Sequence, residues 1–344
     1  MNQPNHETSH EANDKYERQV ILAVDDEAGN LQLLQRILQD DYRLLLAKDG
    51  ARALELARDK RPDLILLDVI MPGMGGYEVC RQLKADPATA GIPVIFVTTL
   101  NDTDDELRGF DYGAVDYITK PVSPLIVRAR VRTHLSLVRI EELRESRLQI
   151  IQRLGLAAEY KDNETGLHVI RMSHYAHVLG LAAGMSAAAA DDLLHAAPMH
   201  DVGKIGIPDS ILRKPGKLDA DEWEIMKTHA TIGAEIIGEH QSPILRMARE
   251  IALIHHEKYD GSGYPRGLAK EQIPLVGRIV AIVDVFDALT SVRPYKKAWS
   301  VEDAIDYLIE QRGKHFDPAL VDLFLTQRPA IDAIRLRWAE QDQH

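Results

Sequence analysis

Five short apolar runs recur through the first third of the chain, and they restrict its fold more than any other feature. The runs are VILAV (20–24), YRLLLA (42–47), DLILL (63–67), PVIFVT (93–98) and VDYIT (115–119). Stretches long enough for amphipathic helices separate them. Continuous apolar runs of this length are typical of strands buried on both faces, so residues 18–122 are predicted to form a doubly wound parallel α/β sheet.

Polar residues interrupt the apolar pattern where four of these runs end. They are Asp25, Asp26, Asp68, Thr98 and Lys120. The carboxyl ends of parallel strands border the functional crevice of such a sheet, so these side chains are expected to meet. Three carboxylates that meet repel one another and need a cation, and oxygen ligands favour Mg²⁺. A simpler alternative is that Asp25 and Asp26 only cap the next helix and that Lys120 only ends a strand.

With these five positions matched, residues 18–122 resemble the receiver domain of two-component response regulators, which has a flavodoxin-like fold. The resemblance implies that Asp68 accepts a phosphoryl group from a sensor histidine kinase. It also implies that Asp25 and Asp26 hold Mg²⁺ and that Thr98 and Lys120 contact the phosphoryl group. Tyr117 would be the aromatic residue that switches position. Residues 1–17 lack apolar periodicity and are expected to be a disordered tail.

A helical connector is predicted to follow, over residues 123–150. Ser123 is a good N-cap residue, Pro124 suits the first helical position, and neither Gly nor Pro occurs again before Gly155. Apolar residues recur at helical spacing, at Leu125, Val131, Leu135, Val138, Leu143, Leu148, Ile151 and Leu154. A long charged helix with an apolar stripe usually pairs with a copy of itself, so a homodimer is expected. Alternatively, the stripe packs on the second domain.

Residues 151–344 are predicted to form a second, all-helical domain, because Ala-rich and Leu-rich segments replace the strand pattern. They contain eleven of the fourteen histidines. In AAPMHDVGKIGIP (196–208) His200 precedes Asp201, and HHEKYDGSGYP (255–265) begins with His255 and His256. Neighbouring residues on a helix point about 100° apart, so adjacent ligands reach different ions. These pairs therefore indicate a site with more than one metal.

Further segments supply compatible ligands. Glu164 and His168 lie four apart and share a helical face, and His229 opens a helix. Asp284 lies in an apolar helix, where a buried carboxylate needs a partner such as a metal ion. Asp287, in the same helix, is better interpreted as a hydrogen-bonding group than as a ligand. Imidazole and carboxylate ligands without thiolate suit Fe, Mn, Ni or Zn.

The order His168, His200 with Asp201, then Asp284 resembles the H…HD…D pattern of the HD superfamily. The additional Glu164, His229, His255, His256 and the loop Gly263, Tyr264, Pro265 narrow the resemblance to the HD-GYP phosphodiesterases. The resemblance implies hydrolysis of cyclic di-GMP by two metal ions, or by three with Glu164 as a ligand. It implies catalytic roles for His200, Asp201 and Lys204. Substrate contacts would come from Lys204, Arg293, Lys296 and Tyr264, although Tyr264 could equally belong to a protein-contact loop.

Charge and composition narrow the functional classes. A net charge of −12 argues against a general nucleic-acid or anionic-membrane binder. The single cysteine, Cys80, excludes a disulfide framework, and no apolar run is long enough to span a membrane, so a cytoplasmic protein is expected. The leading hypothesis is an enzyme, controlled by phosphorylation of Asp68, that converts cyclic di-GMP to pGpG and more slowly to GMP. The alternatives are a weakly active cyclic di-GMP sensor, a protein that docks diguanylate cyclase domains, or a hydrolase of another cyclic dinucleotide.

Overall fold

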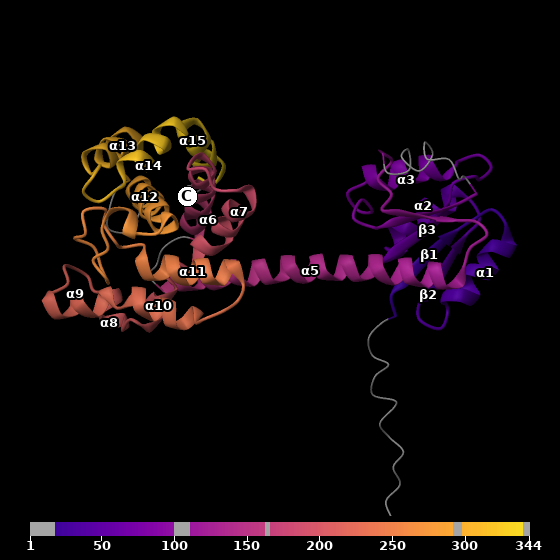
Figure 1. The fold of residues 1–344 in the computed structure, drawn as a ribbon, viewed down its shortest axis with the longest axis horizontal. Helices are drawn as coiled ribbons and strands as arrows, with labels where there is room; N and C mark the ends of the chain where they lie inside the picture. Colours follow the sequence, from indigo (N-terminus) through magenta and orange to yellow (C-terminus); the bar gives the residue numbers. More distant parts are fainter. Residues whose placement is uncertain (1–17, 100–110, 162–165, 292–297, 340–344) are drawn as a thin grey trace, which may run out of the picture. The chain divides into compact units, whose positions relative to one another are not determined.

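The computed structural model describes residues 18–99, 111–161, 166–291 and 298–339 (Figure 1). The chain divides into two compact units, Met1–Leu143 and Arg144–His344. The expected tail at residues 1–17 lies outside the described residues, as do Glu164, Arg293 and Lys296. Within the described ranges, none of the helices combines the length and the apolar character that a membrane span requires.

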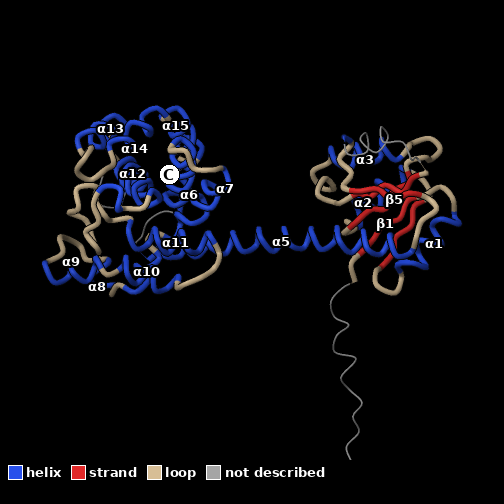
Figure 2. Tube along the Cα trace, viewed as in Figure 1, coloured by secondary structure: helices blue, strands red, loops and turns tan. Residues whose placement is uncertain are grey.

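The first unit is a five-stranded parallel sheet, as predicted (Figure 2). The strands are β1 (Val20–Val24), β2 (Arg43–Ala47), β3 (Leu64–Asp68), β4 (Val94–Thr98) and β5 (Asp116–Thr119), in the order β2-β1-β3-β4-β5. The register places Val24 beside Leu67, and Asp68 beside Val97. The carboxyl ends of β1, β3 and β4 therefore lie at one edge of the sheet.

Helices cover both faces of this sheet. One core contains side chains of α2 (Gly50–Lys60) and α3 (Gly76–Ala85), and the other contains side chains of α1 (Ala28–Leu38) and α5 (Pro124–Lys161). The close approach of α3 to β3 depends on Gly76, because a Cβ there would lie 2.2 Å from the Asp68 carbonyl oxygen. The glycine thus lets α3 start directly beneath the end of the strand that carries Asp68.

Helix α5 is one continuous helix, as the sequence predicts. Val127, Val131 and Leu135 are buried in the core of the first unit, so the first turns of the predicted connector also complete the sheet domain. Leu125 does not join this packing and is 81% exposed. Farther along the helix, Leu137, Ile140 and Leu143 are 55%, 62% and 51% exposed.

The second unit is helical, as predicted. Its helices are α6 (Gly166–Ala182), α7 (Ala187–Ala196), α8 (Asp209–Leu212), α9 (Ala220–Lys227), α10 (His229–Ile237), α11 (Pro243–Ile254), α12 (Leu275–Thr290), α13 (Val301–Glu310), α14 (Pro318–Thr326) and α15 (Arg328–Arg337). Helix α12 is buried along most of its length, and Phe286 packs against Tyr175 of α6 and Phe324 of α14. Because α12 packs among the other helices, it determines where its two carboxylates, Asp284 and Asp287, contact them.

Candidate metal centre and receiver site

The predicted ligands of the second unit converge from separate elements. His168 lies in the first turn of α6, and Asp284 lies in α12. His200 and Asp201 lie between the short 3₁₀ helices Ala197–Met199 and Val202–Gly206. His229 begins α10, and His255 and His256 follow α11. All seven described ligands fall into two groups, and within each group the ligand atoms lie within 4.8 Å of one another: Asp201, His229, His255 and His256; and His168, His200 and Asp284. The adjacent residues His200 and Asp201 lie in different groups, as expected. The expectation that His255 and His256 reach different ions was wrong, because both residues follow the end of α11 and their ring centroids lie 4.0 Å apart in one group.

Two glycines permit this convergence. A Cβ on Gly203 would lie 1.9 Å from the carbonyl oxygen of His229, so only glycine allows the His200–Asp201 segment to close against α10. A Cβ on Gly263 would lie 2.3 Å from the backbone nitrogen of Lys258. Gly263 therefore lets the loop after His256 fold back on itself and carry Tyr264 toward the histidines.

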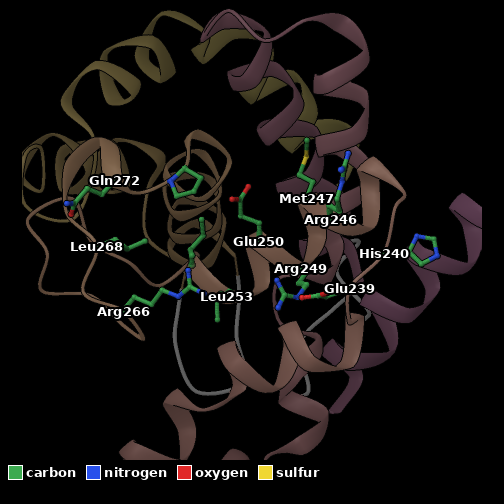
Figure 3. A pocket seen from close by; sticks show the side chains of 12 residues that line it. Glu239, His240, Arg246, Met247, Arg249, Glu250, Leu253, Arg266, Leu268 and Gln272 are labelled. Atoms are coloured by element: carbon green, nitrogen blue, oxygen red, sulfur yellow. The ribbon is translucent and has the colours of Figure 1, made fainter.

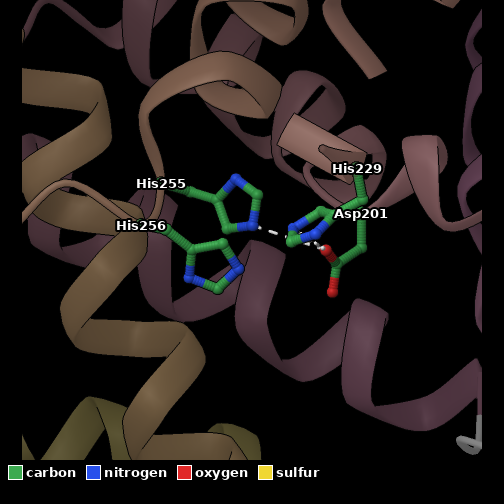
Figure 4. Close-up of side chains that lie close together, drawn as sticks. All are labelled: Asp201, His229, His255 and His256. Atoms are coloured by element: carbon green, nitrogen blue, oxygen red, sulfur yellow. Dashed lines mark ion pairs between the residues drawn. The ribbon is translucent and has the colours of Figure 1, made fainter. Parts of the chain in front are cut away.

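The first group has the geometry of a metal site (Figure 4). His229 Nε2 and His255 Nε2 lie 3.3 and 3.4 Å from Asp201 Oδ1, yet neither nitrogen hydrogen-bonds to a described residue. The other ring nitrogen donates to backbone carbonyls: His229 Nδ1 to Met226 at 2.7 Å, and His255 Nδ1 to Ile251 and Ala252 at 3.2 and 3.1 Å. Each Nε2 therefore directs a lone pair toward an anionic oxygen.

A cation between these atoms would explain why nitrogen lone pairs face an anionic oxygen. Two ligands about 2.1 Å from one ion, at roughly tetrahedral or octahedral angles, lie about 3 to 3.5 Å apart, which matches the distances from Asp201. Hydrogen bonds from Nδ1 to carbonyl groups are the usual way in which proteins orient metal-binding histidines. Burial lowers the pKa of His229, and burial together with His255 and His229 lowers that of His256 further, so both imidazoles are neutral as metal ligands require.

Asp201 joins the two groups. Its Oδ1 faces His229 and His255, while its Oδ2 lies 3.3 Å from His200 Nε2 and 2.8 Å from Lys204 Nζ. In the second group, Asp284 Oδ1 lies 3.4 Å from His168 Nε2 and 3.8 Å from His200 Nε2. Burial raises the pKa of Asp201, but the positive charge of Lys204 and the contact with His200 outweigh burial and hold that pKa well below its usual range. The two oxygens of Asp201 can thus contact two neighbouring ions.

Asp287 contacts a ligand, which agrees with its interpretation as a hydrogen-bonding group. His168 Nδ1 donates to Asp287 Oδ2 at 2.8 Å, and Arg171 Nε donates to Asp287 Oδ1 at 2.7 Å. Burial lowers the pKa of His168, but hydrogen bonds to Asp284 and Asp287 outweigh it and raise the pKa well above its ordinary value. The pair with Asp287 fixes the ring so that Nε2 points toward Asp284.

Tyr264 lies beside this centre. Its ring centroid is 4.8 Å from that of His256 and 6.3 Å from that of His229, and Lys227 Nζ lies 5.9 Å from its ring centroid. Burial raises the pKa of its phenol, so the hydroxyl group is neutral. The ring is half-buried, and it can present an aromatic face next to the metal ligands.

Glu257 is a buried residue that sequence reasoning missed. Its side chain is 2% exposed and accepts hydrogen bonds from the backbone nitrogens of Arg266 at 2.7 Å and Leu268 at 3.0 Å. The carboxylate thereby anchors the loop that contains Tyr264. Its position directly after the His255–His256 pair was the only signal, and it reads equally well as a helix end.

A cavity of about 660 Å³ lies on another face of α11 (Figure 3). Its charged lining includes Arg246, Arg249, Arg266 and the carboxylates Glu239 and Glu250. It contains none of the seven described metal ligands. Because charges of both signs line it and most of these side chains are exposed, its chemistry is that of an ordinary polar surface.

In the first unit, the five residues predicted at the strand ends are all described. Lys120 Nζ lies 2.7 Å from Asp68 Oδ2 and 2.8 Å from Asp25 Oδ2. Oxygens of Asp25, Asp26 and Asp68 lie within 4.8 Å of one another, and Thr98 is buried at the end of β4. Burial raises the pKa of Asp68, and the bond to Lys120 opposes that effect.

Asp25 also has the structural role considered as an alternative. Its Oδ1 accepts hydrogen bonds from the backbone nitrogen of Glu27 at 2.9 Å and from Asn30 Nδ2 at 3.0 Å. Its Oδ2 faces Lys120. The Asp25 carboxylate therefore both anchors the start of α1 and belongs to the acidic group of Asp25, Asp26 and Asp68. Tyr117 lies on β5 and is half-buried. The Arg130 guanidinium lies 5.7 Å from its ring centroid.

Comparisons with known proteins agree with this architecture. Residues 21–132 match the response regulator receiver domain, and residues 147–320 match the HD domain. The "Probable cyclic di-GMP phosphodiesterase" of Vibrio cholerae is 41% identical, over 94% of this chain and 80% of that protein. The cyclic di-GMP phosphodiesterase response regulator RpfG of Xanthomonas campestris is 39% identical, over 91% of this chain and 89% of its own length.

A third relative matches a smaller share of the chain. The "3'3'-cGAMP-specific phosphodiesterase 2" of Vibrio cholerae is 47% identical, over 56% of this chain and 37% of that protein. The two domain matches, together with the two relatives that align over most of both chains, show which family the whole chain belongs to. The chain belongs to the family of response regulators in which a receiver domain precedes an HD domain, a family whose named members include cyclic di-GMP phosphodiesterases.

Proposed function

We propose that this chain is a metal-dependent phosphodiesterase that hydrolyses cyclic di-GMP to pGpG, and more slowly to GMP, under control of its receiver domain. The observation that carries the proposal is the position of Asp201, whose two oxygens face members of the two adjacent groups of ligands. A phosphodiester anion resists attack by water. A centre that holds two cations side by side answers that difficulty directly.

Divalent ions held there would neutralise the charge of the diester and lower the pKa of water. The protein's own contribution is to hold the ligands. Asp201 would bridge the ions, and His168, His200, His229, His255, His256 and Asp284 would be terminal ligands. Lys204, 2.8 Å from Asp201, would bind a phosphate oxygen next to the metals. Tyr264 would stack on a guanine base, and Arg293 with Lys296 would bind the other phosphate.

The metals are expected to be Fe, Mn, Ni or Zn, because the donors are imidazole nitrogens and carboxylate oxygens. Two ions account for the two described groups. Glu164 would supply a ligand for a third ion. Metal analysis of the purified protein by mass spectrometry distinguishes two ions from three for each chain.

We further propose that a sensor histidine kinase phosphorylates Asp68, with Mg²⁺ held by Asp25, Asp26 and Asp68. The ammonium group of Lys120, 2.7 Å from Asp68, would pair with the phosphoryl group, and Thr98 would contact it. The new charge would change the position of Tyr117 next to Arg130. Because α5 packs in the receiver core and continues as one helix to Lys161, it offers a path to the second unit.

The same helix supports a homodimer. Leu137, Ile140, Leu143, Ile150 and Leu154 are each about half exposed or more and recur at helical spacing. Such a stripe on a charged helix is typical of a pair of parallel or antiparallel copies. The proposed enzyme would act in the cytoplasm, where cyclic di-GMP and a kinase are available, and diguanylate cyclase domains could dock on the Tyr264 loop.

The test is turnover by full-length protein loaded with Mn²⁺ or Fe²⁺, with products separated by chromatography. Cyclic di-GMP is expected to give pGpG first, and His200→Ala or Asp201→Ala should abolish turnover. The identity to a 3'3'-cGAMP-specific enzyme makes hydrolysis of that dinucleotide the second candidate function. Faster turnover of 3'3'-cGAMP than of cyclic di-GMP would favour it. Tight binding of cyclic di-GMP with no turnover would instead favour a sensor.

A further inference from the structure

We propose that Lys161, the last residue of α5, is a positioning residue for Lys204 and Asp201. Lys161 Nζ lies 2.7 Å from the carbonyl oxygens of both Ile205 and Ile207, and 3.3 Å from that of Lys204. An ammonium group has three donor hydrogens, and three carbonyl groups surround this one. As far as it concerns catalysis, the inference rests on the proposed function.

The three carbonyl groups belong to the end of the 3₁₀ helix Val202–Gly206 and the residue after it. The Lys204 carbonyl accepts a hydrogen bond from the backbone nitrogen of Ile207 at 3.1 Å, and Lys161 adds a donor from outside the helix to this carbonyl and to those of Ile205 and Ile207. The outside donor thereby fixes where the helix ends. This helix carries Lys204, whose Nζ lies 2.8 Å from Asp201 Oδ2. A shift of the carbonyl groups would therefore move the lysine that contacts the bridging carboxylate.

Lys161 is itself held firmly. Its backbone carbonyl accepts a hydrogen bond from Arg213 Nε at 2.7 Å. Its ammonium also lies 3.4 Å from Asp209 Oδ1, but that carboxylate is 65% exposed, so this ion pair contributes little. The side chain is only partly exposed. Lys161 thus links the end of α5 to the segment that follows the His200–Asp201 pair in sequence.

Gly155 forms the matching contact on the near side. It is buried, and a Cβ there would lie 2.3 Å from the carbonyl oxygen of Pro198, two residues before His200. Helix α5 therefore touches the backbone on both sides of His200 and Asp201, at Pro198 through Gly155 and at residues 204–207 through Lys161. A displacement or rotation of α5 would be transmitted to the catalytic pair at both contacts.

A lysine that only stabilised the fold would lower the fraction of folded protein, which would reduce apparent kcat and bound metal in the same proportion and leave KM unchanged. Positioning makes a narrower prediction, because a misplacement of about 1 Å can cost about 100-fold in rate while substrate still binds. Lys161→Met keeps the length of the side chain and removes the donors. We expect it to lower kcat by about 10- to 100-fold, with KM and bound metal changed less than twofold.

Two variants accompany it. Lys161→Arg retains a cation with several donors and should recover much of the lost kcat. Asp209→Asn removes the charge next to Lys161 but leaves the three carbonyl contacts, so its kcat should equal that of the parent protein. Amide hydrogen exchange, followed by mass spectrometry on metal-loaded full-length protein, should rise in residues 202–208 of Lys161→Met and stay unchanged in Asp209→Asn.

Unchanged kcat and unchanged exchange in Lys161→Met would overturn the proposal. If that variant does not fold, Gly155→Ala tests the other contact, and it should lower kcat because α5 must move away from Pro198. The assays use cyclic di-GMP and, in parallel, bis(p-nitrophenyl) phosphate. If wild type turns over only the synthetic diester, the proposed substrate is wrong, yet the effect of Lys161→Met on that turnover still decides the positioning role.

Discussion

The carboxylate of Asp287 holds His168 in place: its Oδ2 accepts a hydrogen bond of 2.8 Å from His168 Nδ1, across 119 residues of sequence. The same carboxylate pairs with the buried guanidinium of Arg171, which lies one turn after His168 on α6. Helices α6 and α12 are thereby tied together at the level of the metal ligands. With its other nitrogen, Nε2, His168 lies 3.4 Å from Asp284 Oδ1.

Asp287→Asn is therefore expected to destabilise the protein strongly. It removes the charge of a buried carboxylate that pairs with both Arg171 and His168, and breaking a buried ion pair typically costs about 3 to 5 kcal/mol. The free energy of unfolding in urea measures the effect. The matched control is Asp191→Asn. Asp191 pairs at 3.0 Å with His177, which lies on α6 as His168 and Arg171 do, but Asp191 is 61% exposed. Its replacement should therefore lower the free energy of unfolding by under about 1 kcal/mol. Equal losses in both variants would contradict this account.

Removal of metal is expected to lower the melting temperature. The Asp201 and Asp284 carboxylates and the lone pairs of the histidines would lose their cation, and a ligand at about 1,000 times its Kd adds about 4 kcal/mol of stability. Calorimetry with EDTA, then with Mn²⁺ restored, checks this. His229→Ala should reduce bound metal and make the shift smaller, whereas His240→Ala, at an exposed position outside both groups, should leave the shift intact.

Asp68→Asn is expected to prevent phosphorylation. The amide cannot form an acyl phosphate, and the bond to Lys120 loses its charge. Incubation with acetyl phosphate and Mg²⁺, followed by intact-protein mass spectrometry, should show an added phosphoryl group in the parent and none in the variant. Asp59→Asn, an exposed change on α2, serves as the control and should be phosphorylated normally. If Asp68→Asn is still phosphorylated, another residue is the acceptor.

Tyr264→Ala is expected to raise KM for cyclic di-GMP by about 5- to 100-fold, since stacking of a base on an aromatic ring contributes about 1 to 3 kcal/mol. Tyr264→Phe keeps the ring beside His256 and should change KM little. Steady-state kinetics separates the two. If the alanine variant keeps its KM but loses binding to diguanylate cyclase domains, Tyr264 belongs to a protein-contact loop instead.

Ile140→Asp combined with Leu137→Asp is expected to convert a dimer to a monomer, because each change puts a charge into the proposed helix pair. Light scattering coupled to size-exclusion chromatography gives the mass. Leu336→Asp on α15, at a residue that is 67% exposed, controls for a general effect of added charge. A parent protein that is monomeric at micromolar concentration would contradict the proposal directly.

Local patterns were sufficient for much of this molecule. The apolar runs specified strands, because a strand buried on both faces needs continuous apolar side chains, and Pro124 marked the start of α5. The end of α5 was less clear, since Gly155 reads as a helix breaker. Gly155 lies inside the helix, and the Pro198 carbonyl oxygen occupies the space that a Cβ would take there. The exposure of Leu125 was not predictable from spacing alone, because spacing does not say which side chains find a partner.

The sequence by itself determined the kinds of chemistry present: imidazole and carboxylate ligands in pairs, an acidic group at the ends of strands, and one long helix between two domains. Tertiary structure alone decided which atoms meet. It turned the two oxygens of Asp201 toward different groups, assigned Asp287 to His168 and Arg171, buried Glu257 beneath the Tyr264 loop, and brought Lys161 to the carbonyl groups of residues 204–207. The reason is physical: periodicity reports a residue's neighbours within a helix or strand, whereas these contacts join residues far apart in sequence, whose distance depends on how whole helices pack.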